Sequence, residues 1–207
     1  AIELDRDLAA ILRSDPFLKG LTLIEADALK VNFEALPGSG DLRVFGNLPY
    51  NITSPIIFHL LSQRGIKDMH FMLQKEVVDR LCAGPHCRDY GRLTVMVQYH
   101  AEVIPVLDVP PEAFRPRPKV NSAVVRLKPK NLTADERALA PFLNTVALNA
   151  FNTRRKTLRN SLSTLFCTEE MQDLNIDTTL RAEDLNLASF VVLAKALRDK
   201  KLNEETI

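Results

Sequence analysis

The stretch from Leu42 to Leu61, which reads LRVFGNLPYNITSPIIFHLL, restricts the possible folds more than any other part of the chain. It begins with the apolar pattern of a short buried strand and continues through a polar turn that contains Pro49. A helix is then predicted, with Ser54 as its N-cap and Pro55 at its first position. A strand, a turn and a helix in this order form half of a βαβ unit. In open α/β sheets, ligands bind at the loop that follows such a strand.

The predicted turn combines a rigid backbone with hydrogen-bond acceptors and an aromatic ring. Pro49 has a fixed φ and favours an extended Leu48, so the carbonyl groups and the Asn47 amide are expected to sit in a stiff frame. Tyr50 follows directly. Acceptors beside a flat ring suit a planar base with an exocyclic amine, because the ring can stack while the acceptors bind the amine hydrogens. The alternative is that Asn47 only forms the turn and Tyr50 only packs in the loop.

Several segments together resemble the ribosomal RNA adenine N6-dimethyltransferase family, in particular its small-subunit rRNA members. They are NLPYNITSPIIFHLL (47–61), QKEVVDRL (74–81), YGRLTVMVQY (90–99), FRPRPKVNSAVVRL (114–127) and FNTRRKTLRNSL (151–162). These segments are distributed between residues 47 and 162, and the last two favour the small-subunit members over the large-subunit, antibiotic-resistance type. The resemblance implies an α/β fold: a Rossmann-like, S-adenosylmethionine-dependent methyltransferase domain with a small C-terminal α-helical domain.

The resemblance also implies a role for individual residues. Glu3 would bind the ribose hydroxyls of S-adenosylmethionine, Asp27 its adenine amine, and Asn47 would lie where cofactor and target meet. The target adenine would stack on Tyr50, with Phe114 as a second ring. Its N6 would be held by the Asn47 side chain and the Leu48 carbonyl. The implied catalytic set is Asn47, Leu48, Pro49, Tyr50 and Phe114. Considered alone, a loop phenylalanine such as Phe114 is more often a packing anchor.

Polar residues close three predicted strands in the first part of the chain. Glu3 lies near the end of the run 1–4, Asp27 follows the run 21–26, and Asn47 ends the run 42–47. Because the carboxyl ends of parallel strands share one edge of a sheet, we expect these side chains to line one cleft. A salt-bridged strand end is the alternative for Glu3.

No glycine-rich turn precedes Glu3, so we expect the chain to begin at the second strand of its domain. Without that loop, much of the cofactor pocket would be missing. We therefore expect this chain to be inactive or very weak as an enzyme. A non-catalytic, RNA-binding ribosome-assembly factor is the alternative.

The remaining elements follow from periodicity and capping. We predict helices from Asp5, from Lys75 and over 90–99, a strand over 66–73, and an antiparallel pair over 102–109 and 122–128 joined by a proline-rich loop. Thr133 and Glu136 form a capping box that opens a further helix, and helices follow at 154–166 and 187–198. The predicted domains are a methyltransferase domain at 1–128 and a helical RNA-binding domain at 132–207.

The charge is unevenly distributed, although its net value is only +1. Between Arg115 and Asn160 there are eleven Lys or Arg and two acidic residues, so the rest of the chain is net acidic. Such polarity indicates that a polyanion meets one side of the molecule. The alternative is a solvated basic helix face. The predicted RNA-binding residues are Arg115, Arg117, Lys119, Arg154, Arg155, Lys156 and Arg159.

The sequence gives little support for a disulfide-rich, metal-binding, membrane-spanning or hydrolytic protein. The three cysteines include no CxxC, which favours a reduced, cytoplasmic setting over a disulfide framework. Cys82, His86 and Cys87 fit no zinc spacing, so we predict no metal site. No apolar run reaches the length of a membrane span, and no HExxH or nucleophile motif supports hydrolase chemistry. The expected protein is a monomer whose partner is small-subunit rRNA.

Overall fold

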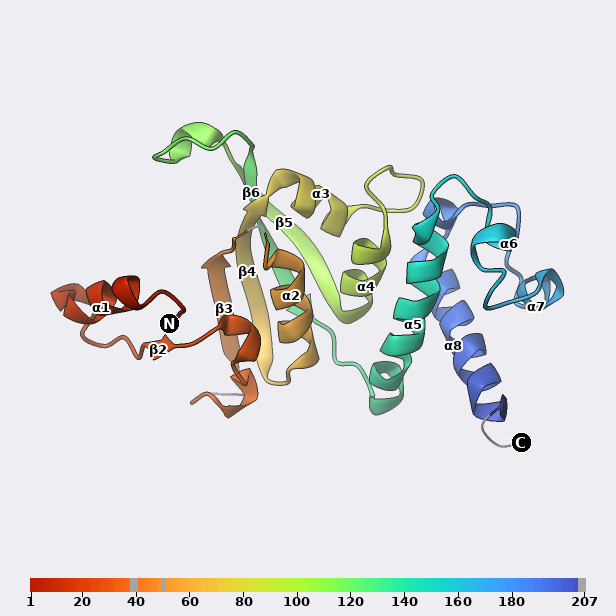
Figure 1. Cartoon of the computed structure of the whole chain (residues 1–207), viewed down its shortest axis with the longest axis horizontal. Helices are drawn as coiled ribbons and strands as arrows, with labels where there is room; N and C mark the ends of the chain where they lie inside the picture. Colours follow the sequence, from red (N-terminus) through yellow and green to blue (C-terminus); the bar gives the residue numbers. More distant parts are fainter. Residues whose placement is uncertain (38–40, 50, 205–207) are drawn as a thin grey trace.

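The structure is a computed structural model that describes residues 1–37, 41–49 and 51–204. Figure 1 shows α1 and two short strands at one end, a four-stranded sheet with its helices in the middle, and a group of helices at the other end. The predicted mixed α/β fold with a helical C-terminal region is confirmed.

The main sheet contains β3 (Leu42–Asn47), β4 (Ile66–Gln74), β5 (Ala101–Val109) and β6 (Ser122–Pro129), in the order β3-β4-β6-β5. β3 and β4 are parallel, whereas β6 is antiparallel to both β4 and β5. The predicted antiparallel pair is therefore confirmed. The alternating residues Met69, Phe71 and Leu73 of β4 are buried against helices, as expected for a strand with one covered face.

The helices α2 (Thr53–Ser62), α3 (Lys75–Cys82) and α4 (Arg92–His100) cover this face of the sheet. Ile57 and Leu60 of α2 and Leu81 of α3 are fully buried against the sheet. The N-cap predicted for α2, Ser54, is wrong by two residues, because α2 starts at Thr53 and its N-cap is Ile52. The Thr53 hydroxyl donates to the Pro49 carbonyl at 3.1 Å, so the helix start is tied to the turn before it.

The first strands do not extend the main sheet. β1 (Ile2–Glu3) and β2 (Ile24–Glu25) pair in parallel with each other, and they form a separate sheet among the described residues. α1 (Arg6–Ser14) lies between them in sequence. Its predicted start is confirmed, since the Asp5 carboxylate accepts from the backbone N–H groups of Asp7 and Leu8 at 2.9 and 3.0 Å.

The C-terminal part contains α5 (Ala134–Asn152), α6 (Leu158–Ser161), α7 (Thr168–Asp173) and α8 (Leu187–Glu204). The capping box that opens α5 is confirmed by reciprocal hydrogen bonds between Thr133 and Glu136. The helix predicted over 154–166 is wrong in extent. It is helical only over the short α6, because 154 and 155 lie in a turn, 156 is a bend and residue 157 makes an isolated β-bridge to Arg181.

The helical core continues into the sheet domain through α4. Val95, Met96 and Tyr99 of α4 share one buried cluster with residues of α5 and α8. Tyr99 also donates its hydroxyl to the Glu136 carbonyl at 2.7 Å. The helix therefore packs against both the sheet and α5, as its position in Figure 1 indicates. The boundary near residues 129–131 stays a prediction.

Candidate active site

A cavity of about 410 Å³ lies at the carboxyl ends of β3 and β4. It brings together the turn after β3, the end of β4, the proline-rich loop and the start of β6. The lining residues are Asn47, Leu48, Pro49, Met72, Leu73, Phe114, Pro116, Pro118 and Ser122. Four members of the predicted catalytic set, Asn47, Leu48, Pro49 and Phe114, thus share one cavity. Tyr50, the fifth, lies outside the described residues.

Hydrogen bonds to β4 and to the start of α2 fix the backbone of the turn after β3. The Leu48 N–H donates to the Met72 carbonyl at 3.3 Å, which ties the turn to β4. The Pro49 carbonyl accepts from the Thr53 hydroxyl at 3.1 Å and from the Ile52 N–H at 3.2 Å. Within the described part of the chain, the Asn47 side chain and the Leu48 carbonyl make no hydrogen bond, so both remain available to a ligand.

The second wall of the cavity comes from the loop between β5 and β6. A 3-10 turn at Pro111–Ala113 precedes Phe114, which is half-buried. Figure 1 shows this loop projecting beyond the ends of β5 and β6. Because Phe114 lines the cavity together with the turn after β3, its ring can face a ligand that the turn holds. Arg115, Arg117 and Lys119 are exposed on the same loop, and Arg117 forms an ion pair with Glu112.

The prediction that Glu3, Asp27 and Asn47 lie along the edge of one sheet is wrong among the described residues, whereas a cleft that these residues share around the cofactor stays a prediction. Glu3 and Asp27 belong to the β1–β2 region, which makes no ladder with β3, and the cavity around Asn47 includes neither of them. Each carboxylate is also used locally. One oxygen of Glu3 accepts from the Asp5 N–H at 2.8 Å, and one oxygen of Asp27 accepts from the Leu29 N–H at 3.0 Å.

The four predicted RNA-binding residues around the start of α6 differ in their contacts; they are Arg154, Arg155, Lys156 and Arg159. Arg154 donates to the Arg88 carbonyl at 2.8 Å, so it fastens the loop between α3 and α4 to the helical part. The same loop is held by the His86 N–H, which donates to the Glu183 carbonyl at 2.8 Å. The other three residues have exposed side chains without a hydrogen bond or ion pair to the rest of the described chain; they are Arg155, Lys156 and Arg159.

β4, the strand that carries Met72, also carries the acidic member of a buried ion pair. Asp68 of β4 is fully buried and accepts from Arg126 of β6 at 2.7 Å, with Arg43 of β3 at 3.6 Å. Burial raises the pKa of this carboxyl, but the Arg126 hydrogen bond and the charges of Arg43, Arg126 and His70 hold the pKa below its ordinary value. This group links β3, β4 and β6, which together support the cavity.

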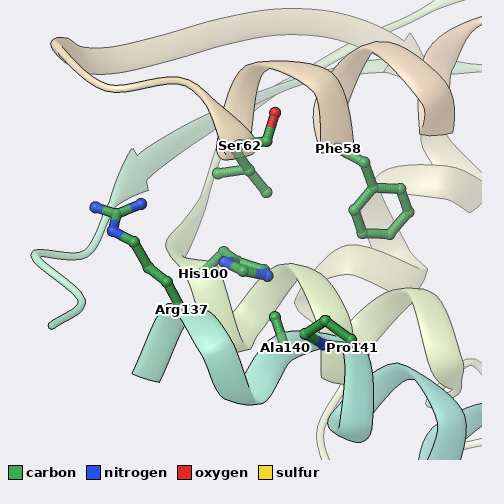
Figure 2. A pocket seen from close by; sticks show the side chains of 7 residues that line it. Phe58, Ser62, His100, Arg137, Ala140 and Pro141 are labelled. Atoms are coloured by element: carbon green, nitrogen blue, oxygen red, sulfur yellow. The ribbon is translucent and has the colours of Figure 1, made fainter. Parts of the chain in front are cut away.

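A second hollow of about 300 Å³ lies between α2 and α5. Figure 2 shows Phe58 of α2 on one side of the hollow and His100, Ala140 and Pro141 on the other, with Ser62 on α2 and Arg137 at one side. Burial, together with the nearby charges of Arg137 and Lys130, lowers the pKa of His100. None of the predicted site residues lines this hollow.

The described residues contain neither a metal cluster nor a membrane span. No group of three or more His, Cys, Asp or Glu side chains among them is placed to hold a metal ion. No helix within 1–37, 41–49 and 51–204 is long and apolar enough to cross a membrane.

Met72 and Ser122 are cavity residues that the sequence did not indicate. Both lie on the antiparallel pair β4–β6, and Ser122 follows Asn121 in the segment FRPRPKVNSAVVRL. The signal that could have found Ser122 is its place within a segment that resembles the family.

Known proteins similar to this chain share both its sequence and its fold. A "Ribosomal RNA small subunit methyltransferase A" from Actinobacillus pleuropneumoniae serotype 3 is 56% identical over 207 residues, which cover 96% of this chain and 71% of the relative. The protein of the same name from Pasteurella multocida is 54% identical, covering 96% and 72%.

A solved dimethyladenosine transferase from Plasmodium falciparum superposes with a TM-score of 0.80 at 26% identity, covering 97% of this chain and 82% of that one. The 23S rRNA methyltransferase ErmE, at 24% identity and a TM-score of 0.67, shares the fold, with coverage of 95% and 80%. The family model described as "Ribosomal RNA adenine dimethylase" matches residues 1–199. The chain therefore belongs to the ribosomal RNA adenine dimethylase family.

Proposed function

We propose that this protein transfers methyl groups from S-adenosylmethionine to N6 of adenosine in small-subunit rRNA. The finer target is two adjacent adenosines near the 3′ end, each methylated twice. The observation that carries the proposal is the cavity that the Asn47 side chain and the Leu48 carbonyl, both without partners among the described residues, share with Phe114.

The turn after β3 would contribute to catalysis mainly by positioning the amine of the target adenine. The amine of adenine is a poor nucleophile, because its lone pair is delocalised into the ring. Two acceptors that bind its hydrogens favour a pyramidal nitrogen and direct the lone pair away from the ring plane. The Leu48 N–H bond to Met72 and the Pro49 carbonyl bonds keep these acceptors in place before the base arrives, so little reorganisation is needed.

The residues assigned to the cofactor fit an adenosyl group by their chemistry. When bound, S-adenosylmethionine supplies an electrophilic methyl group on a sulfonium. Glu3 and Asp27 each use one carboxylate oxygen for a backbone N–H, so the second oxygen can accept from a ribose hydroxyl or an adenine amine. Asn47 would lie between the cofactor and the base.

RNA would be bound by exposed basic residues in two segments, the cavity loop and the turn before α6. Arg115, Arg117 and Lys119 lie on the cavity loop, and Arg155 and Lys156 are exposed next to Arg154, which holds the loop between α3 and α4. Phosphate contacts of this kind position a nucleic acid without reading its sequence. The base must also leave its stack, which favours an unpaired target.

The test is transfer of tritiated methyl groups from S-adenosylmethionine to immature small ribosomal subunits. Label in N6,N6-dimethyladenosine of the small-subunit rRNA would support the proposal, and robust label would also show that the expectation of an inactive or very weak chain is wrong. Label in large-subunit rRNA would redirect the substrate assignment. RNA binding without any label would support the non-catalytic alternative.

A further inference from the structure

Ser122 is a buried polar residue in the wall of the cavity. It is the first residue of β6, pairs with Gln74 of β4 and Val109 of β5, and is only 7% exposed. Its side chain makes no hydrogen bond to the described residues, although it lines the cavity with Asn47 and Phe114.

Two other buried hydroxyls of the sheet domain are satisfied within the protein. Thr53 donates to the Pro49 carbonyl at 3.1 Å, and Thr94 donates to the Arg80 carbonyl at 2.6 Å. The Ser122 hydroxyl oxygen has no such partner among the described residues and is not fully enclosed by them, so it can be reached from the cavity that Ser122 lines. A ligand in the cavity can therefore complete its hydrogen bonding.

The chemistry of adenine indicates which contact is missing. Asn47 can accept a hydrogen from N6 and donate to one of the two ring nitrogens beside the amine, N1 or N7, while the Leu48 carbonyl accepts the second N6 hydrogen. The other flanking ring nitrogen is an acceptor and needs a donor. The remaining lining side chains are leucine, proline, methionine and phenylalanine, which offer no donor, so Ser122 is the side chain suited to this role.

We propose that Ser122 is a specificity-determining residue, whose hydroxyl donates a hydrogen bond to a ring nitrogen beside the amine of the target adenine. This inference rests on the proposed function. It adds a third polar contact, from β6, to the two that the turn after β3 provides. Because the bond reads the ring rather than the amine, it affects recognition of the base before any methyl group is transferred.

The experiment combines a protein change with a substrate change. Wild type and Ser122→Ala are titrated with short unpaired RNAs that carry adenosine, 1-deazaadenosine or 7-deazaadenosine at the target position, and methyl transfer to the same RNAs is measured. Each deaza analogue replaces one flanking ring nitrogen by C–H. Ser161→Ala is the matched control, because it removes a buried hydroxyl, also without a partner among the described residues, from the helical part.

We expect Ser122→Ala to bind the adenosine RNA about three- to tenfold more weakly, the range for one neutral hydrogen bond, and Ser161→Ala to bind as wild type does. For one of the two analogues, wild type should bind more weakly than it binds the adenosine RNA, by the same factor. Ser122→Ala should bind that analogue and the adenosine RNA with equal affinity. That analogue identifies the nitrogen. The wild-type comparison across the RNAs does not depend on how well a variant folds.

Two outcomes would overturn the inference: an equal penalty for Ser122→Ala on all three RNAs, or wild-type binding that is unaffected by both analogues. Failure of the proposed function gives a different pattern. In that case wild type transfers no methyl group to any RNA, while the binding measurements still decide the role of Ser122.

Discussion

Replacing Asn47 with alanine should separate the chemistry of the cavity from the stability of the fold. The Asn47 side chain is exposed and bonds to no other described residue, so its removal breaks no hydrogen bond within that part of the protein. We expect the free energy of unfolding to change by less than about 0.5 kcal/mol, the range for such surface positions. Turnover should fall by about 10²–10³, equivalent to roughly 2.7–4 kcal/mol in the activation barrier, because one preorganised polar group is removed.

The assay measures methyl transfer under saturating cofactor and RNA, with denaturant unfolding of the same samples. Asn131→Ala is the matched control, since Asn131 is an exposed asparagine between β6 and α5 and does not line the cavity. It should retain wild-type turnover. Near-normal turnover in Asn47→Ala would refute the role assigned to this side chain, and a large loss of stability would show that the residue supports the fold instead.

Three further outcomes follow from the same geometry. Phe114→Ala should weaken binding of unpaired RNA by about 1–3 kcal/mol, because a stacking ring is removed; unchanged affinity in a titration would mean that the ring only packs. Neutralising Arg155, Lys156 and Arg159 together should flatten the salt dependence of RNA binding by about 0.7 for each phosphate that is no longer neutralised, whereas an unaltered slope assigns these charges to solvent. The pKa of Asp68 is held below its ordinary value, so its ion pair stabilises the fold above that ordinary value and ceases to do so as pH falls through the lowered pKa. Asp68→Asn should therefore lack this acid-dependent part of the stability curve in denaturant unfolding, and identical curves would contradict the assignment.

Local features of the fold were predictable because they depend on residues within one helical turn. The Asp5 cap and the Thr133–Glu136 capping box are confirmed, and so is the antiparallel pair that encloses the proline-rich loop. The failures concern places where local signals compete. Ser54 was the predicted N-cap, but α2 begins at Thr53 with Ile52 as an N-cap that makes no side-chain bond, and the Thr53 hydroxyl donates to the Pro49 carbonyl.

The sequence by itself determined the family, the rigid turn that carries Asn47, and the stiff loop that carries Phe114, because each is encoded in short continuous segments. Only the tertiary structure decided which residues share a cavity. Ser122 meets Asn47 because β6 pairs with β4, while Glu3 and Asp27 lie with a separate two-stranded sheet. The physical reason is that strand order is set by hydrogen bonds between segments far apart in the chain, which no periodicity within a single strand can specify.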